Sequence, residues 1–176
     1  MKTLKFNYLA AVLILVFGGM FIACNNLLTP KQDLGEFVEM ETLLKDTTYQ
    51  GKRVSVEGYF CLTSDLETRS DKFGLSFLSD VKFNKEAIPV YNWKTPSVTV
   101  YLKCYKDGVN TFYVPSSFEE KDLKLYTNDG EELPYNAKVR LSGDVDFNTG
   151  TDFRVYRDLG RYIVYLHNVR IDKLEE

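Results

Sequence analysis

Histidine, cysteine and closely spaced carboxylates are the residues of this chain whose types could support catalysis or metal binding. The 176 residues contain one histidine, His167, three cysteines, and no Cys-x-x-Cys, His-x-x-x-His or Gly-x-Ser-x-Gly motif. Catalysis usually needs a nucleophile or a metal, a base, and groups that orient them. We expect His167 to be a buried or half-buried structural residue, because it shares its strand phase with Ile163, Tyr165, Val169 and Ile171. The sequence therefore predicts no catalytic residues and no enzyme.

Asp144, Asp146 and Asn148 have the spacing that opens an EF-hand calcium loop. That loop then requires Gly at its sixth place and Glu at its twelfth, where this chain has Thr149 and Val155. The two aspartates are better explained as the end of a strand that leads into a turn. We expect no metal site and no cofactor.

Cys24 differs from the other cysteines because it ends an apolar run that extends from Leu9 to Ala23. Lys2 and Lys5 precede the run, and no acidic residue interrupts it. This is the layout of a secretory signal. A membrane-spanning helix needs about 20 apolar residues, which is more than this run supplies. An uncleaved single-pass anchor is the alternative.

The stretch Phe21-Ile22-Ala23-Cys24 resembles the lipobox of bacterial lipoproteins, although Phe21 stands where Leu is usual. The resemblance implies that Cys24 receives a diacylglycerol, that residues 1–23 are removed, and that the new amine is acylated, for example with palmitate. Two or more acyl chains hold a protein stably on a membrane. Asn25 stands where an enterobacterial inner-membrane retention signal has Asp. The expected location is therefore the cell envelope, at the outer membrane, on its periplasmic or surface face.

Charge argues against a nucleic-acid partner. The whole chain has 22 Lys and Arg against 25 Asp and Glu, and the removed segment contains two lysines and no acid. The mature chain is therefore left with 20 basic and 25 acidic side chains. Binding to a phosphate backbone depends on an excess of cationic side chains, so we expect no nucleic acid among the partners.

The mature chain is expected to contain a lipidated tether (24–32), an N-terminal helix (33–48) and one barrel domain (49–176). Asp33-x-x-Glu36 fits a capping box, and apolar residues follow it at mostly helical spacing, which predicts a helix over about 33–45. Five segments then alternate with the period of a strand: 52–62, 72–80, 97–105, 137–145 and 160–171. Ser117-x-x-Glu120 can cap a short helix between the third and fourth, and Asn128-Asp129-Gly130 predicts a tight turn.

Five strands with a helix between the third and fourth predict an all-β fold with short helices, the five-stranded Greek-key barrel called the OB-fold. The stretches "GKRVSVEGYF", "FGLSFLSD", "VTVYL", "AKVRLSGDVD" and "RYIVYLHNVRI" resemble the strands of bacterial OB-fold domains, including the tRNA-anticodon-binding-like group. Gly58 and Gly143 fall where strands of such a barrel bend sharply. In this register Cys61 faces out of strand one and Cys104 faces in from strand three. Two separate thiols are expected, with a disulfide as the alternative.

The resemblance implies a ligand face on strands two and three. Its residues are Lys72, Ser76, Trp93, Thr99, Tyr101, Lys103 and Tyr105. Aromatic rings beside hydroxyls and lysines can stack sugar rings or hold a peptide, although tyrosine is also common in strands for packing alone. Because OB-folds bind many ligands, the fold does not decide the function. We expect a lipid-anchored binding or adaptor module whose partner is an envelope protein, a peptide or a glycan. The alternative is a structural or stress-related envelope component without a small-molecule ligand.

Overall fold

The computed structural model describes residues 32–61, 68–69, 72–83, 89–90, 92, 94–103, 108–115, 122–148 and 159–174. The predicted lipidation site Cys24, the predicted helix at Ser117 and the thiol of Cys104 lie outside these residues. All described residues belong to one compact unit that begins at Gln32. In the part of the chain that is described, no helix has the length and apolarity required to cross a membrane.

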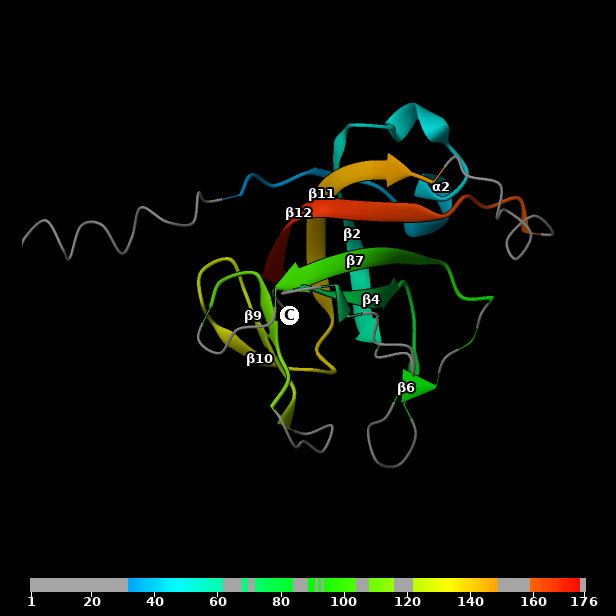
Figure 1. Ribbon diagram of the computed structural model, residues 1–176. Helices are drawn as coiled ribbons and strands as arrows, with labels where there is room; N and C mark the ends of the chain where they lie inside the picture. The colour runs from blue at the N-terminus through cyan, green and yellow to red at the C-terminus, as the bar shows by residue number, and fades with distance from the viewer. Residues whose placement is uncertain are drawn as a thin grey trace, which may run out of the picture. The chain divides into compact units, whose positions relative to one another are not determined.

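A closed barrel of five strands forms the centre of this unit (Figure 1). The strands are β2 (Arg53–Cys61), β4 (Lys72–Leu78), β7 (Ser97–Lys103), β11 (Val139–Phe147) and β12 (Val164–Lys173). Around the barrel the order is β2, β4, β7, β12, β11 and back to β2, with all pairs antiparallel except β7 with β12. This is the OB-fold Greek key, so the predicted fold class is confirmed. Each barrel strand overlaps its predicted segment.

Gly58 marks the place where β2 changes partners. Up to Gly58 the strand pairs with β11, and from Tyr59 onward it pairs with β4. A Cβ at position 58 would collide with the carbonyl oxygen of Leu78, so the two strands can approach this closely only at a glycine. Gly143 is similarly crowded, with the carbonyl oxygen of His167 3.0 Å from where its Cβ would lie. Both glycines thus occupy sites of close strand approach.

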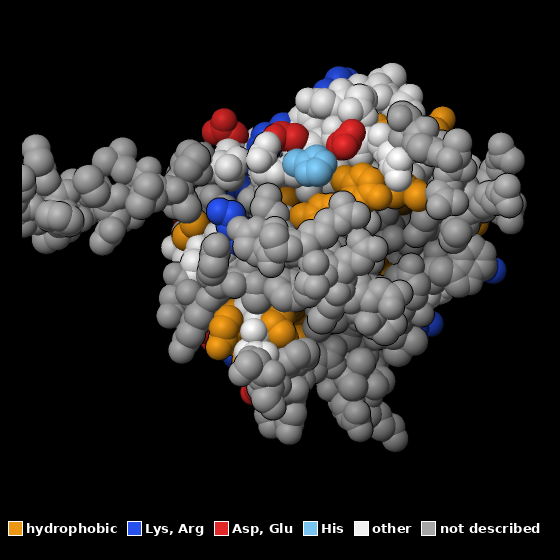
Figure 2. Space-filling model, in the orientation of Figure 1, with side chains coloured by type: hydrophobic (Ala, Val, Ile, Leu, Met, Phe, Trp, Pro, Cys, Tyr) orange, Lys and Arg blue, Asp and Glu red, His pale blue; other side chains and the backbone are white. Residues whose placement is uncertain are grey.

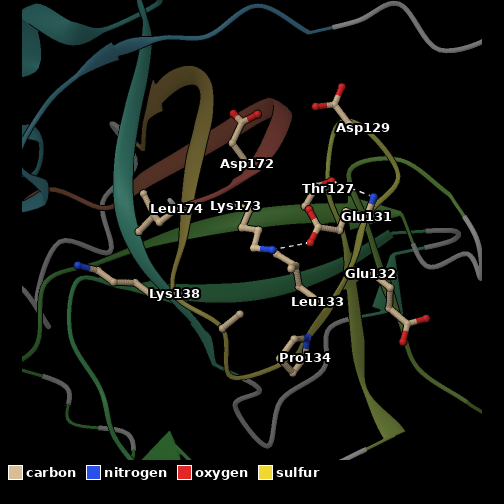
Figure 3. Close-up of a pocket in the computed structure, with 11 residues that line it drawn as sticks. Thr127, Asp129, Glu131, Glu132, Leu133, Pro134, Lys138, Asp172, Lys173 and Leu174 are labelled. Atoms are coloured by element: carbon tan, nitrogen blue, oxygen red, sulfur yellow. Dashed lines mark hydrogen bonds and ion pairs between the residues drawn. The ribbon is translucent and has the colours of Figure 1, made fainter. Parts of the chain in front are cut away.

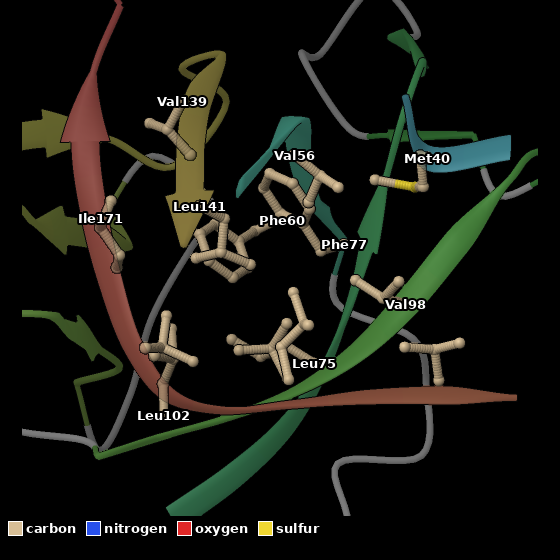
Figure 4. Close-up of a cluster of buried hydrophobic side chains, with 14 of the residues drawn as sticks. Met40, Val56, Phe60, Leu75, Phe77, Val98, Leu102, Val139, Leu141 and Ile171 are labelled. Carbon is tan, nitrogen blue, oxygen red and sulfur yellow. The ribbon is translucent and has the colours of Figure 1, made fainter. Parts of the chain in front are cut away.

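The core fills the barrel and extends under the N-terminal helix (Figure 4). Phe60 and Phe77, both fully buried, meet edge to face with ring centroids 4.9 Å apart. The labelled residues in Figure 4 come from all five barrel strands and from the helix: Met40, Val56, Phe60, Leu75, Phe77, Val98, Leu102, Val139, Leu141 and Ile171. Burying each such side chain contributes roughly 1.5–3 kcal/mol, which makes this cluster the main stabilising element of the barrel.

The predicted helix over 33–45 is largely wrong. Residues Glu36–Phe37 form strand β1, parallel to β2, and the α-helix α2 is limited to Met40–Leu43, followed by the 3₁₀ helix η1 (Thr47–Tyr49). Gly35 packs so closely on Val54 that a Cβ there would collide with the backbone of Val54. The open edge of β2 therefore captures this segment, because a sheet edge satisfies its backbone groups and a short isolated helix is marginal.

A bulge in β12 shifts the predicted phase of the last strand. Ser142 pairs with Arg170, and Asp144 pairs with His167. The single residue Gly143 of β11 therefore lies opposite two residues of β12, Asn168 and Val169. Asn168 has a φ of 49°, a left-handed conformation in which Asn is enriched. Val164 and Leu166 face the core before the bulge, and Val169 and Ile171 after it. The side chain of His167 is therefore 47% exposed, contrary to its predicted place beside the core.

Short strands extend the sheet beyond the barrel. Three of them continue the sheet from β7: β8 (Thr111–Tyr113), β9 (Lys124–Tyr126) and β10 (Glu132–Pro134). Strand β3 (Thr68–Arg69) is added beside β4. A separate two-stranded sheet consists of β5 (Lys82–Phe83) and β6 (Pro89–Val90). The predicted turn at Asn128-Asp129-Gly130 is confirmed, because the backbone NH of Gly130 donates to the carbonyl of Thr127 at 3.0 Å between β9 and β10.

Cys61 lies at the end of β2 and is buried, as is its neighbour Phe60. The expectation that Cys61 faces outward while Phe60 faces inward therefore does not describe this end of the strand. Burial of both residues means that exposure stops alternating there. The predicted pair of separate thiols stays a prediction, because Cys104 is outside the described residues.

Candidate functional site on the outer face of β4, β7 and β12

Four residues of the predicted ligand face lie together on the outside of the barrel. Thr99, Tyr101 and Lys103 alternate along β7 with buried Val98, Val100 and Leu102, and Ser76 of β4 pairs directly with Thr99. On the other side of β7, Thr99 pairs with Tyr165 of β12. We call this surface the tyrosine face and define it by Ser76, Thr99, Tyr101, Lys103 and Tyr165.

Tyr101 and Tyr165 form a stacked pair at the middle of the tyrosine face. Their ring centroids are 6.0 Å apart and their planes differ by 19°. The ring of Tyr101 also covers Gly74, whose Cβ, if present, would lie 3.1 Å from the Cε1 atom of Tyr101. Gly74 therefore lets the ring lie close against the strand. We call this pair of nearly parallel rings the aromatic platform, because such rings offer apolar surface for stacking.

Tyr165 was not among the predicted site residues. The sequence placed it in the same phase as the core residues of the last strand, and only the bulge at Asn168 reveals that it faces outward. The parallel pairing of β12 with β7 then brings it beside Thr99 and Tyr101. The pairing of β12 with β7 is expected for an OB-fold. What the sequence did not reveal is that Tyr165 faces outward on β12.

A small hollow lined by hydroxyl groups lies at one end of the tyrosine face. Its volume is about 30 Å³, which is enough to hold a water molecule. The polar side chains that line it are those of Ser76, Thr95, Ser97, Thr99, Arg161 and Tyr162. Hydroxyl groups both donate and accept hydrogen bonds, so this hollow suits a polar ligand group such as another hydroxyl.

Arg161 holds the wall of this hollow in place. Its Nη1 atom donates to the carbonyl of Lys94 at 2.6 Å, and its Nη2 atom lies 2.6 Å from Oε2 of Glu41. Burial would raise the pKa of Glu41, but hydrogen bonds from Arg161 and Lys45 outweigh burial and lower that pKa. The backbone NH of Tyr162 donates to the carbonyl of Leu44 at 2.8 Å. The hollow is thus fixed to the segment around α2.

Polar residues of β11 and β12 continue the tyrosine face on its other side. Asp146 pairs with Tyr165 across the two strands, and its Oδ2 atom lies 3.5 Å from Nε2 of His167. Gln50 donates from Nε2 to Oδ1 of Asp146 at 3.2 Å. Figure 2 shows the single histidine of the chain beside acidic side chains, with hydrophobic side chains along its lower edge. A bound ligand can therefore meet aromatic and hydrogen-bonding groups side by side.

Three predicted residues of the ligand face are not placed by the structure. Trp93 and Tyr105 lie outside the described residues. Lys72 belongs to β4, where its backbone pairs with Lys103, but the described residues do not extend to its side chain. The part of the predicted face that the structure brings together is therefore Ser76, Thr99, Tyr101 and Lys103.

A larger hollow of about 1190 Å³ lies between the β9–β10 hairpin and the end of β12 (Figure 3). Its lining includes the carboxylates of Asp129, Glu131, Glu132 and Asp172 and the ammonium groups of Lys138 and Lys173. Lys173 reaches across it to Glu131, with Nζ 2.7 Å from Oε1 (Figure 3). None of the described residues that line this open hollow is aromatic, so these residues offer a ligand less than the tyrosine face does.

Within the described residues, no group of three or more His, Cys, Asp or Glu side chains is arranged to hold a metal ion. The chemistry that the tyrosine face offers is stacking and hydrogen bonding. Comparison with known proteins adds no assignment, because no protein-family model, no curated protein and no solved structure matches this chain.

Proposed function

We propose that this protein is a lipid-anchored binding module of the bacterial cell envelope, and that it binds its ligand on the tyrosine face. The observation that carries the proposal is the stack of Tyr101 on Tyr165 over Gly74. The absence of a Cβ at Gly74 lets the ring of Tyr101 lie close against the sheet beside Tyr165. Gly74 and Tyr101 belong to the second and third barrel strands, which OB-folds commonly use for ligands, and Tyr165 adds a ring from the fifth.

A glycan is the ligand class that the tyrosine face favours. The apolar faces of sugar rings can stack on the platform of Tyr101 and Tyr165, as bases and other flat groups do on aromatic side chains. The hydroxyl-lined hollow next to it matches the hydroxyl groups of a sugar, since both partners donate and accept hydrogen bonds. The acidic balance of the mature chain disfavours nucleic acids, the other common ligands of this fold.

Attachment to the envelope is proposed from the sequence at Cys24. A cleaved signal that ends in a lipobox-like stretch would leave Cys24 as the lipidated first residue, with the barrel following a short tether. The alternative function is a structural or stress-related envelope component without a small-molecule ligand. The two functions differ in whether the tyrosine face contacts a ligand.

Binding of the purified lipoprotein, held in detergent micelles, to an array of envelope glycans tests the proposal. We expect binding of one glycan class with a loss of about tenfold in affinity for Tyr101→Ala, corresponding to about 1.4 kcal/mol, and retained binding for Tyr101→Phe. Tyr113→Ala, in β8 outside the barrel, is the matched control and should bind like the wild type.

Equal binding by the Tyr101→Ala and Tyr113→Ala variants would contradict the tyrosine face as the site. If no glycan binds, in-cell cross-linking from a photoreactive residue at position 101 decides between the remaining functions. A cross-link to one envelope protein would replace the glycan with a protein partner. The absence of any cross-link would favour the structural component.

A further inference from the structure

Two large hydrophobic side chains are exposed where the described chain begins. Among the described residues the exposed large hydrophobics are Leu34 at 53%, Phe37 at 49% and Tyr162 at 37%. Tyr162 lies at the hydroxyl-lined hollow and packs edge to face on Phe147. Leu34 and Phe37, by contrast, are three residues apart in one segment, Gln32–Phe37, which we call the entry segment. Large apolar side chains exposed together often mark a contact surface.

The entry segment is held rigidly against the barrel. Arg170 donates from Nη1 to the carbonyl of Gln32 at 2.7 Å, and Arg53 donates from Nε to the carbonyl of Asp33 at 2.7 Å. Its last two residues form β1 against β2 (blue in Figure 1). Leu34 and Phe37 are therefore presented by a backbone that is fixed on both sides.

The charged groups around the two side chains are mostly neutralised in pairs. Arg140 lies 5.8 Å from the ring of Phe37 and 2.7 Å from Glu57, and Arg170 lies 2.8 Å from Asp172. Leu34 shares a hollow of about 510 Å³ with these four charged residues. Asp33 and Glu36 add two exposed acidic residues. This surface lacks the cationic excess that an anionic membrane attracts, and it is compatible with a zwitterionic one.

The tether limits how far the entry segment can lie from a lipid at Cys24. Eight residue steps join Cys24 to Gln32, and they span at most about 28 Å when fully extended. A flexible chain of that length has a root-mean-square span of roughly 16 Å. A protein anchored through Cys24 therefore keeps the entry segment at a high effective concentration near the bilayer surface.

We propose that Leu34 and Phe37 insert into the interfacial region of the membrane that holds Cys24. This inference rests on the lipid anchor of the proposed function. The apolar side chains leave water, while the guanidinium of Arg140, which lies over the ring of Phe37, stays at the level of the lipid phosphates. The barrel is then oriented by two contacts, the acyl chains and the entry segment, instead of rotating freely on its tether.

Quenching of a single tryptophan by brominated lipid tests this contact. Because Trp93 is the only tryptophan of the chain, Phe37→Trp is made in a Trp93→Phe background, and Leu34→Trp is made separately in the same background. The lipoproteins are reconstituted in phosphatidylcholine vesicles with and without bromine in the acyl chains. We expect at least a twofold loss of emission for the indoles at positions 34 and 37. Tyr162→Trp, at the other exposed site, is the matched control and should lose little.

Vesicle flotation separates the two ways in which the inference can fail. If the lipoprotein does not float with the vesicles, the lipid anchor is wrong and the inference fails with it. If it floats but neither position 34 nor position 37 is quenched more than position 162, the anchor stands and the inserted contact is overturned. Quenching at both positions of the entry segment with little quenching at position 162 supports the contact.

Discussion

The Nη1 atom of Arg53 lies 2.9 Å from Oδ1 of Asp144, and this ion pair joins β2 to β11 beside the bulge in β12. The other carboxylate oxygen of Asp144 accepts a hydrogen bond of 2.7 Å from the side-chain amide of Asn168. Nη1 of Arg53 also donates to the carbonyl of Asn168 at 3.1 Å. Arg53 and Asp144 thus provide hydrogen-bond partners for Asn168, the residue of the bulge that takes the left-handed conformation.

This arrangement predicts a loss of stability in acid. Burial would raise the pKa of Asp144, but hydrogen bonds from Asn168 and Arg53 outweigh it and lower that pKa. A carboxyl group whose pKa is lower in the folded state stabilises the protein above the pKa of the unfolded chain, and this contribution is lost as the pH falls through the folded-state pKa. We expect Asp144→Asn to lower the free energy of unfolding by about 1 kcal/mol at pH 7 and by progressively less as the pH falls below about 4 toward the folded-state pKa.

Urea denaturation of the wild type and the variant at pH 7, 5 and 3.5 measures this difference. Glu39→Gln is the control, because Glu39 is exposed and makes no side-chain hydrogen bond at the start of α2. A difference between wild type and Asp144→Asn that stays constant down to pH 3.5 would show that the charge of Asp144 does not stabilise the bulge.

Gly58→Ala and Gly74→Ala form a matched pair that separates the fold from the site. A Cβ at position 58 collides with the backbone of Leu78, whereas one at position 74 meets only the ring of Tyr101. We expect Gly58→Ala to lower the free energy of unfolding by at least about 2 kcal/mol, and Gly74→Ala to change it by less than about 1 kcal/mol. Thermal and urea denaturation measure both values, and equal losses would contradict this explanation of the two glycines.

The same pair links stability to binding. Gly74→Ala should displace the ring of Tyr101 and reduce glycan affinity while the barrel stays folded. A Gly74→Ala variant that binds as tightly as the wild type would mean that the position of the Tyr101 ring does not matter for the ligand. This measurement uses the glycan identified on the array, with Tyr113→Ala again as the control.

Replacement of Cys24 tests the lipid anchor. We expect Cys24→Ala to incorporate no labelled fatty acid and to keep the circular dichroism spectrum of the folded barrel, because no lipid can then be attached at that position. Cys61→Ala, which changes a buried thiol of β2, should be labelled like the wild type. Fatty-acid labelling that persists in Cys24→Ala, or is absent from the wild type, would contradict a lipid anchor at Cys24.

The barrel strands could be predicted because their side chains alternate along the sequence, whereas the exceptions depend on contacts between distant segments. The helix expected from Asp33 onward is replaced because Gly35 fits against Val54 and β1 completes the edge of β2. Neither contact is visible in the local pattern, since the partner lies about 20 residues away. Tertiary pairing overrides helical spacing in so short a segment.

The candidate site was predicted in part for the same reason. Thr99 and Tyr101 follow from the alternation in β7, but Tyr165 requires knowledge of the bulge at Asn168. That bulge is set by the close approach of Gly143 to β12 and by the hydrogen bond from Asn168 to Asp144. One unpaired residue shifts every side chain of the preceding half-strand to the opposite face.

The hydrogen bonds from Arg53 and Arg170 to the entry segment have a mechanical consequence. Force applied to the chain ahead of Gln32 is carried first by the carbonyls of Gln32 and Asp33, and then by the short ladder of β1. The hydrogen-bonded strand pairs that close the barrel come after these contacts along the chain from the tether. We therefore expect a pull on the tether to break these hydrogen bonds and the two-residue pairing of β1 with β2 before the longer strand pairs of the barrel.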